Sequence, residues 1–327
     1  MSSASDSKLA GLRRILPWIV TVGLLYLIFR HISVADVVAA TRHAAPWTIP
    51  AAILGIAAIY FADSFAIWKT FGWFLAPLTF GQVLVVRGAT YLLAAINYNV
   101  GQGAMVYFIH RAKGTTIMRG VATLLLILGI NVLALIILST VGLGIALDVP
   151  HVVSIVIFVA YGGLAVYALA VAFKPRWLAE RPLFDVLLGA GLGGHLKALA
   201  VRLPHIAVLL GFQLSILNAF GIRVPVAQAI VTLPLVFFIA VLPISVQGLG
   251  TNQAVMTFFF ARYAPGDAEA QRATVVAASL FATALATTVQ AALGVACLRT
   301  RTGQELRAAA AASASAKPAV NPGPAGG

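Results

Sequence analysis

Residues 243–253 read Pro-Ile-Ser-Val-Gln-Gly-Leu-Gly-Thr-Asn-Gln, and an earlier stretch at 97–103 reads Asn-Tyr-Asn-Val-Gly-Gln-Gly. Both stretches place glycines and amides between long apolar segments, where a membrane helix would be uniformly apolar. Backbone that leaves the helix at membrane depth is tolerated only where protein buries it or a wet cavity solvates it. The sequence therefore predicts two broken helices, one in each half of the chain, over 80–111 and 226–263.

The composition around these stretches is that of a polytopic membrane protein. Hydrophobic residues make up 61% of the 327 residues and charged residues only 9%, whereas soluble domains are about 25% charged. We therefore expect an all-α membrane helix bundle, in which the two broken helices form re-entrant hairpins of an inverted-topology repeat. The expected full spans are 15–29, 46–68, 120–147, 152–173, 204–222 and 273–298.

The membrane domain is expected to occupy residues 13–303, between a disordered start at 1–12 and a disordered Ala/Ser/Pro/Gly tail at 304–327. Its first half would cover 13–173 and its second half 204–303, joined by a cytoplasmic linker at 174–203. Leucines at helical spacing over 183–203 predict that most of this linker is one amphipathic helix in the membrane interface.

The net charge of +13 follows from Lys and Arg in short segments between apolar runs. Such charges set topology and meet anionic lipid headgroups, so we expect no nucleic-acid partner. Placing both termini in the cytoplasm puts most of the 22 Lys and Arg on that side. The two broken regions then enter from opposite faces of the inner (plasma) membrane, which an inverted repeat requires.

The two broken regions supply the candidate binding residues. Glycines let the backbone leave helical geometry, and a helix that restarts after a break points free N–H groups and its positive dipole end at the gap. This arrangement suits a phosphate group, although small residues also serve close helix packing. The candidates are Asn97, Asn99, Gly101, Gln102 and Gly103 in the first break, and Ser245, Gln247, Gly248, Gly250, Asn252 and Gln253 in the second.

Asp63 is the acidic residue expected deep inside a span. A carboxyl group there costs about 2.5–3.5 kcal/mol, so it needs a partner or a role, and Lys69 and Arg87 are the expected partners. A proton-coupling role, a counter-charge role and a purely structural role all remain open. Arg87 and Arg111 flank the first break and are predicted to collect anionic headgroups at the cytoplasmic face, with Arg262 in the matching outer position.

With these motifs, the chain resembles the flippase-like family named for the transmembrane region of lysylphosphatidylglycerol synthase. The family carries an Asn- and Gly-rich segment before a basic turn, here 96–103 followed by His110-Arg111, and a Pro-(Ile/Val)-Ser-x-Gly-Gly-Leu-Gly segment, here 243–250. The resemblance covers about residues 12–300. Two departures are Gln247 in place of a glycine, and Asn252-Gln253 where the family often has Arg-Glu.

The resemblance implies lipid translocation, and without the soluble aminoacyl-transfer domain we do not expect lysine transfer. We expect a lipid translocator or lipid-binding transporter for a polar-headed, polyprenyl- or hopanoid-type lipid, which sits in a midplane cavity between the two breaks. We expect no enzymatic activity, cofactor or metal, because acid–base pairs and metal-ligand spacings are lacking. The alternatives are an intramembrane lipid-headgroup transferase and a scaffold for membrane-associated biosynthetic enzymes.

Overall fold

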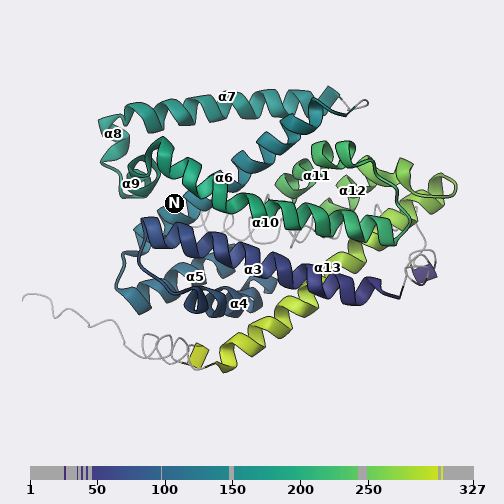
Figure 1. Ribbon diagram of the computed structural model, residues 1–327, viewed down its shortest axis with the longest axis horizontal. Coiled ribbons are helices and arrows are strands. Elements are labelled where there is room, and N and C mark those ends of the chain that lie inside the picture. Colours follow the sequence, from purple (N-terminus) through teal and green to yellow (C-terminus); the bar gives the residue numbers. More distant parts are fainter. Residues whose placement is uncertain are drawn as a thin grey trace, which may run out of the picture.

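The computed structural model describes residues 46–96, 98–146, 151–241 and 249–300, and the isolated positions 26, 35, 38, 39, 42, 303 and 304. Every element in these ranges is helical, which confirms the predicted all-α class. Five helices are long and apolar enough to cross a membrane (Figure 1). They are α3 (Thr48–Phe74), α6 (Ile117–Leu143), α7 (His151–Phe173), α10 (Gly191–Ala219) and α13 (Ala268–Arg299).

Four predicted spans, at 46–68, 120–147, 152–173 and 273–298, correspond to α3, α6, α7 and α13. The apolar runs locate these helices because each is long enough to cross the hydrocarbon layer. The predicted span at 15–29 and the predicted disordered ends at 1–12 and 304–327 lie outside the described ranges, apart from Tyr26 and Gln304.

The structure has two helices where one helix was predicted over 183–203. After the short helix α8 (Arg176–Ala179), this segment forms α9 (Pro182–Gly189) and the first half of α10, which runs on through most of the predicted span 204–222. Its apolar side chains Val186, Leu187 and Ala198 pack against residues of α6. Pro204 lies inside α10 without ending it, as membrane helices tolerate.

Both predicted broken regions are interrupted where the sequence indicates. The first consists of α4 (Phe80–Ile96) and α5 (Tyr98–Lys113), and the second of α11 (Val226–Val241) and α12 (Thr251–Phe260), followed by the 3-10 turn η2 (Ala261–Tyr263). The helices α4 and α5 lie side by side, because a Cβ added to Gly101 would stand 2.6 Å from the Cβ of Ala94 and 2.9 Å from its backbone N. The glycine at 101 therefore permits the close approach of the two helices.

This close approach predicts opposite effects for two neighbouring glycines. Gly101→Ala is expected to destabilise the fold by about 1–3 kcal/mol, because the new methyl group overpacks the α4–α5 contact. A Cβ on Gly103 meets nothing within 4 Å, so Gly103→Ala gains up to about 1 kcal/mol from helix propensity alone. Thermal unfolding of the two purified variants measures the signs, and destabilisation of equal size in both would contradict the close approach.

Helices from the two halves of the chain also meet at small residues. Gly142 of α6 lies against α11, where an added Cβ would stand 2.6 Å from the backbone N of Val231. Ser139 Oγ donates to the carbonyl of the same Val231 at 3.1 Å. In α13, a Cβ on Gly294 would stand 2.6 Å from Leu92 of α4. Small residues thus let α11 pack closely on α6 and α4 on α13.

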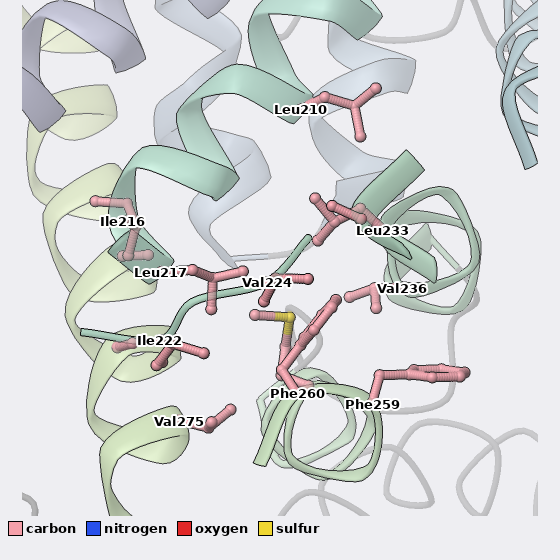
Figure 2. Close-up of a cluster of buried hydrophobic side chains, with 14 of the residues drawn as sticks. Leu210, Ile216, Leu217, Ile222, Val224, Leu233, Val236, Phe259, Phe260 and Val275 are labelled. Atoms are coloured by element: carbon pink, nitrogen blue, oxygen red, sulfur yellow. The ribbon is translucent and has the colours of Figure 1, made fainter. Parts of the chain in front are cut away.

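The largest buried cluster among the described residues lies mainly in the second half of the chain (Figure 2). Ile216 and Leu217 of α10, Leu233 of α11, Phe260 of α12 and Val275 of α13 converge there, and each is buried. In contrast, α7 runs along the upper edge of the bundle and diverges from α6 away from their connection (Figure 1). Its residue Phe158 is 81% exposed, as expected for a helix that faces lipid.

Candidate functional site

A buried ionic cluster joins the two halves of the chain. Asp63 of α3 is 3% exposed. Its Oδ2 accepts a hydrogen bond from Arg87 Nε of α4 at 2.7 Å, and its Oδ1 accepts one from Arg202 Nη1 of α10 at 2.6 Å. Both distances are typical of strong, charge-assisted hydrogen bonds. One carboxylate thus connects an arginine from each half.

Polar and aromatic neighbours surround these three side chains. Arg202 Nε donates to Asn131 Oδ1 of α6 at 3.0 Å, and the Arg87 guanidinium lies 5.1 Å from the centre of the Tyr91 ring. His205, one turn beyond Arg202 on α10, is also buried. The cluster therefore stands where α3, α4, α6 and α10 meet, and each guanidinium is held by more than its ion pair.

Two guanidinium groups share one carboxylate in this cluster. Charged groups at membrane depth are costly and mark ligand or ion pathways. Arginine also offers a fork of N–H donors that matches phosphate and carboxylate groups. The arrangement is therefore suited to an anionic group at the boundary between the halves.

The structure confirms one predicted partner of Asp63 and corrects two other expectations. Arg87 pairs with Asp63 as expected. It does not belong to a surface group beside Arg111, because its side chain is only 13% exposed and lies along α4. Lys69 is not a partner, since its Nζ lies 4.1 Å from the centre of the Trp68 ring. At the end of α3, the lysine stacks on an aromatic face and does not reach inward.

Sequence reasoning missed Arg202. The residue was assigned to the linker 174–203, whereas it lies in the middle of α10 and is 9% exposed. The available signal was the short apolar run at 198–201 directly before Arg202, which extends the apolar span backwards past Pro204. An arginine inside such a span needs a counter-charge, and Asp63 is the acidic residue predicted at the same depth.

In the second break, Gln253 is the predicted site residue whose surroundings best fit a ligand-binding role. Gly250 has a φ of +82°, a backbone conformation that favours glycine. Gln253 Oε1 accepts from Gly250 N at 2.7 Å, which caps the start of α12. Gln253 is fully buried, and its Nε2 has no hydrogen-bond partner, so this amide retains a free donor. Neighbouring Asn252 is half-buried.

The other predicted break residues are scattered or outside the described ranges. Gln102 is half-buried, whereas Gly103 and Arg111 are exposed, and Arg262 lies 5.0 Å from the Tyr263 ring. Packing of α5 is mainly on α4 and α6, whereas α12 packs mainly on α13 and α11, so α5 and α12 have no main packing partner in common. Outside the described residues lie Asn97, Ser245, Gln247, Gly248 and the side chain of Asn99.

A cavity of about 540 Å³ lies between α6 and α7, with α9, α10 and α11 contributing to its walls. Among the described residues that the sequence singled out for lipid binding, none lines it. The sequence placed the cavity between the two breaks, and this expectation does not hold for the cavity described here. Its walls are apolar except at Ser139, Tyr167 and His195.

No protein-family model matches the chain, and no curated protein matches it. The candidate site therefore rests on its geometry, and the resemblance to the flippase-like family remains a proposal.

Proposed function

We propose that this protein is an integral membrane translocator for a lipid with an anionic headgroup, of the polyprenyl or hopanoid type that the resemblance implies. The observation that carries the proposal is the buried Arg87–Asp63–Arg202 cluster, which both halves of the chain build and in which two guanidinium groups share one carboxylate. The headgroup would bind the two guanidinium groups while the lipid tails stay in the hydrocarbon layer.

We also propose an inverted repeat, which would place the site between two oppositely oriented halves. We infer that α3, α4, α5 and α6 correspond in order to α10, α11, α12 and α13, because corresponding helices begin at similar separations along the sequence. Val226 begins α11 146 residues after Phe80 begins α4, and Ala268 begins α13 151 residues after Ile117 begins α6. Both α6 and α13 also start with a side-chain cap, from Thr116 and Asp267 respectively. The second break is thus about five residues longer than the first.

Burial along α3 and α10 follows the same spacing. Six of the ten buried positions of α3 have a buried counterpart 146 residues later in α10, so the two helices present similar faces to the interior. The pairs are Ala52 and Ala198, Ile56 and Arg202, Tyr60 and Ile206, Ser64 and Leu210, Thr70 and Ile216, and Phe71 and Leu217.

The packing partners also exchange consistently between the halves. The main contacts between the halves are α3 with α10, α4 with α13, and α6 with α11. If each helix is replaced by its counterpart in the other half, the α3–α10 pair maps onto itself, and the α4–α13 pair becomes the α11–α6 pair. The helices α3 and α10 run in opposite directions, because Asp63 meets Arg202 while the earlier Gly55 meets the later Phe212. Repeats of opposite orientation place a transporter's site at their interface, which is where the ionic cluster lies.

The lengths of the short helices favour re-entrant hairpins. The 17 residues of α4 cover about 25 Å at about 1.5 Å per residue, less than the roughly 30 Å of hydrocarbon. The 10 residues of α12 cover about 15 Å. We propose that each pair of helices enters the membrane and returns to the same face, and that the two pairs enter from opposite faces.

Within this mechanism, Asp63 acts as the counter-charge that an incoming anion replaces. Arg87 belongs to a hairpin of the first half and Arg202 to a long helix of the second, so movement of the halves would change the distance between the two guanidinium groups. In one arrangement of the halves, both guanidinium groups would bind a lipid phosphate. In the other arrangement, both would bind Asp63. Because both carboxylate oxygens already accept from arginine, this role fits Asp63 better than that of a free general base.

Lipid transfer in proteoliposomes tests the proposal. We expect the protein to accelerate the movement of labelled polyprenyl phosphate between leaflets, and Arg87→Gln or Arg202→Gln to slow it about tenfold or more, since a charge-assisted contact contributes about 1.5–3 kcal/mol. Lys69→Gln is the matched control, because it removes a cation of α3 that lies outside the cluster. Rates equal to those of empty vesicles across anionic lipids, or equal losses in all three variants, would overturn the proposal.

A further inference from the structure

Part of the wall of the cavity between α6 and α7 comes from helices outside the two repeats. One long wall is α7, and α9 contributes Leu187; both helices lie between the halves and have no counterpart in the repeat. The cavity also lies on a different side of α6 from the ionic cluster. Asn131 contacts Arg202, whereas Gly129, Val132 and Leu133 line the cavity.

The cavity is suited to hydrocarbon. It lies along α7, a candidate membrane span, and Leu133, Ile136, Val156, Leu164 and Phe238 are among its lining residues. Water does not fill apolar cavities of this kind, because it needs two to four polar partners. Since lipid is the solvent around α7, the natural occupant is a lipid chain or ring system.

The polar groups of the wall restrict which polar group the bound lipid can have. His195 Nδ1 lies 2.7 Å from the carbonyl oxygen of Gly191, so this nitrogen must be the donor. In the neutral ring Nε2 is then an acceptor, and Tyr167 Oη donates its proton to it at 2.7 Å. The Tyr167 oxygen keeps its acceptor lone pairs but has no proton left to give.

Ser139 carries the other hydroxyl of the wall, and its proton is also already used in a hydrogen bond. Its Oγ donates to the carbonyl of Val231 at 3.1 Å. Each of the two described hydroxyls of the wall already donates its proton to a protein group, so toward a ligand in the cavity each can only accept a hydrogen bond. A carboxylate, phosphate or ether would find no hydroxyl donor there, whereas an alcohol supplies the missing proton.

We propose that this cavity binds a lipid whose hydrocarbon part ends in an uncharged hydroxyl group, with that hydroxyl donating to Tyr167 Oη. The site is separate from the ionic cluster and takes a ligand of different charge, so it does not depend on the proposed translocation. Binding there would connect α7 to α6 across the side of the molecule where they diverge.

Photo-labelling of the full chain in lipid nanodiscs tests this proposal. The probes are a diazirine-bearing long-chain alcohol and its methyl ether, and the labelled peptides are mapped to α6 and α7. We expect the alcohol to label these peptides at least fivefold more than the ether, and unlabelled long-chain alcohol to compete. Equal labelling by both probes, or stronger labelling by the matching fatty acid, would overturn the proposed hydroxyl contact.

Two neighbouring glycines of α7 give a matched pair of variants. Gly163 lines the cavity and Gly162 does not, and a Cβ at either position meets nothing within 4 Å. Gly163→Phe is expected to abolish labelling by filling the cavity, and Gly162→Phe to leave it unchanged. Equal labelling of the two variants would refute occupation of the cavity.

Two further variants cover folding and the hydroxyl contact. If Gly163→Phe does not fold, Gly129→Leu fills the same cavity from α6, where an added Cβ is also unobstructed. Tyr167→Phe should keep labelling by the hydrocarbon and remove the preference for the alcohol over the ether. A preference that survives Tyr167→Phe would show that another group binds the hydroxyl, contrary to the proposal.

Discussion

Replacement of Asp63 by alanine is expected to lower the free energy of unfolding by about 3–5 kcal/mol, the largest single-residue effect that we foresee. The carboxylate is buried and accepts from both Arg87 and Arg202. Its removal leaves two guanidinium groups without their counter-charge in a region where water cannot replace it. Chemical unfolding in mixed micelles, followed by circular dichroism, measures the change.

Asp267→Ala is the reference variant with which the stability loss of Asp63→Ala is compared. Asp267 caps α13 by accepting from the backbone N of Ala270 at 2.9 Å, at an exposed position. Loss of such a cap costs about 1 kcal/mol. An Asp63→Ala variant that loses no more stability than Asp267→Ala would show that the buried ion pairs contribute little, and that the two arginines find other partners.

The second large effect concerns function without loss of the fold. We expect a variant with Asp63→Leu, Arg87→Met, Arg202→Met and Asn131→Leu to recover most of the stability lost in Asp63→Ala. Replacing a whole buried ionic group by apolar side chains of similar volume is often neutral or stabilising by about 1–4 kcal/mol. Lipid transfer, in contrast, should fall to the rate of empty vesicles, because nothing in the cluster could then bind an anionic headgroup.

These two measurements separate a structural role of the cluster from a functional one. If the apolar variant folds and still transfers lipid at the wild-type rate, the cluster serves only to join the halves, and the headgroup binds elsewhere. The second break would then be the next candidate, since Gln253 keeps a free, buried donor there.

Helix positions could be predicted well from the chain because they depend on local patterns. Apolar run length located α3, α6, α7 and α13, and the glycine and amide residues at 97–103 and 243–253 located the two interruptions. The segment before Pro204 could not be assigned this way. Its glycines and charged residues suggest an interfacial helix, and only the contacts of Leu187 and Ala198 with α6 bury it.

Composition and local periodicity settled that this is a helical membrane protein with one interruption in each half, since hydrocarbon demands continuous apolar helices and tolerates breaks only under protein cover. Which charges meet was decided by the packing of the helices. Asp63 and Arg202 lie 139 positions apart and pair because α3 and α10 cross in opposite directions. Likewise, the cavity exists because α7 diverges from α6. The angle between two packed helices depends on their tertiary contacts, which the hydropathy of the sequence does not reveal.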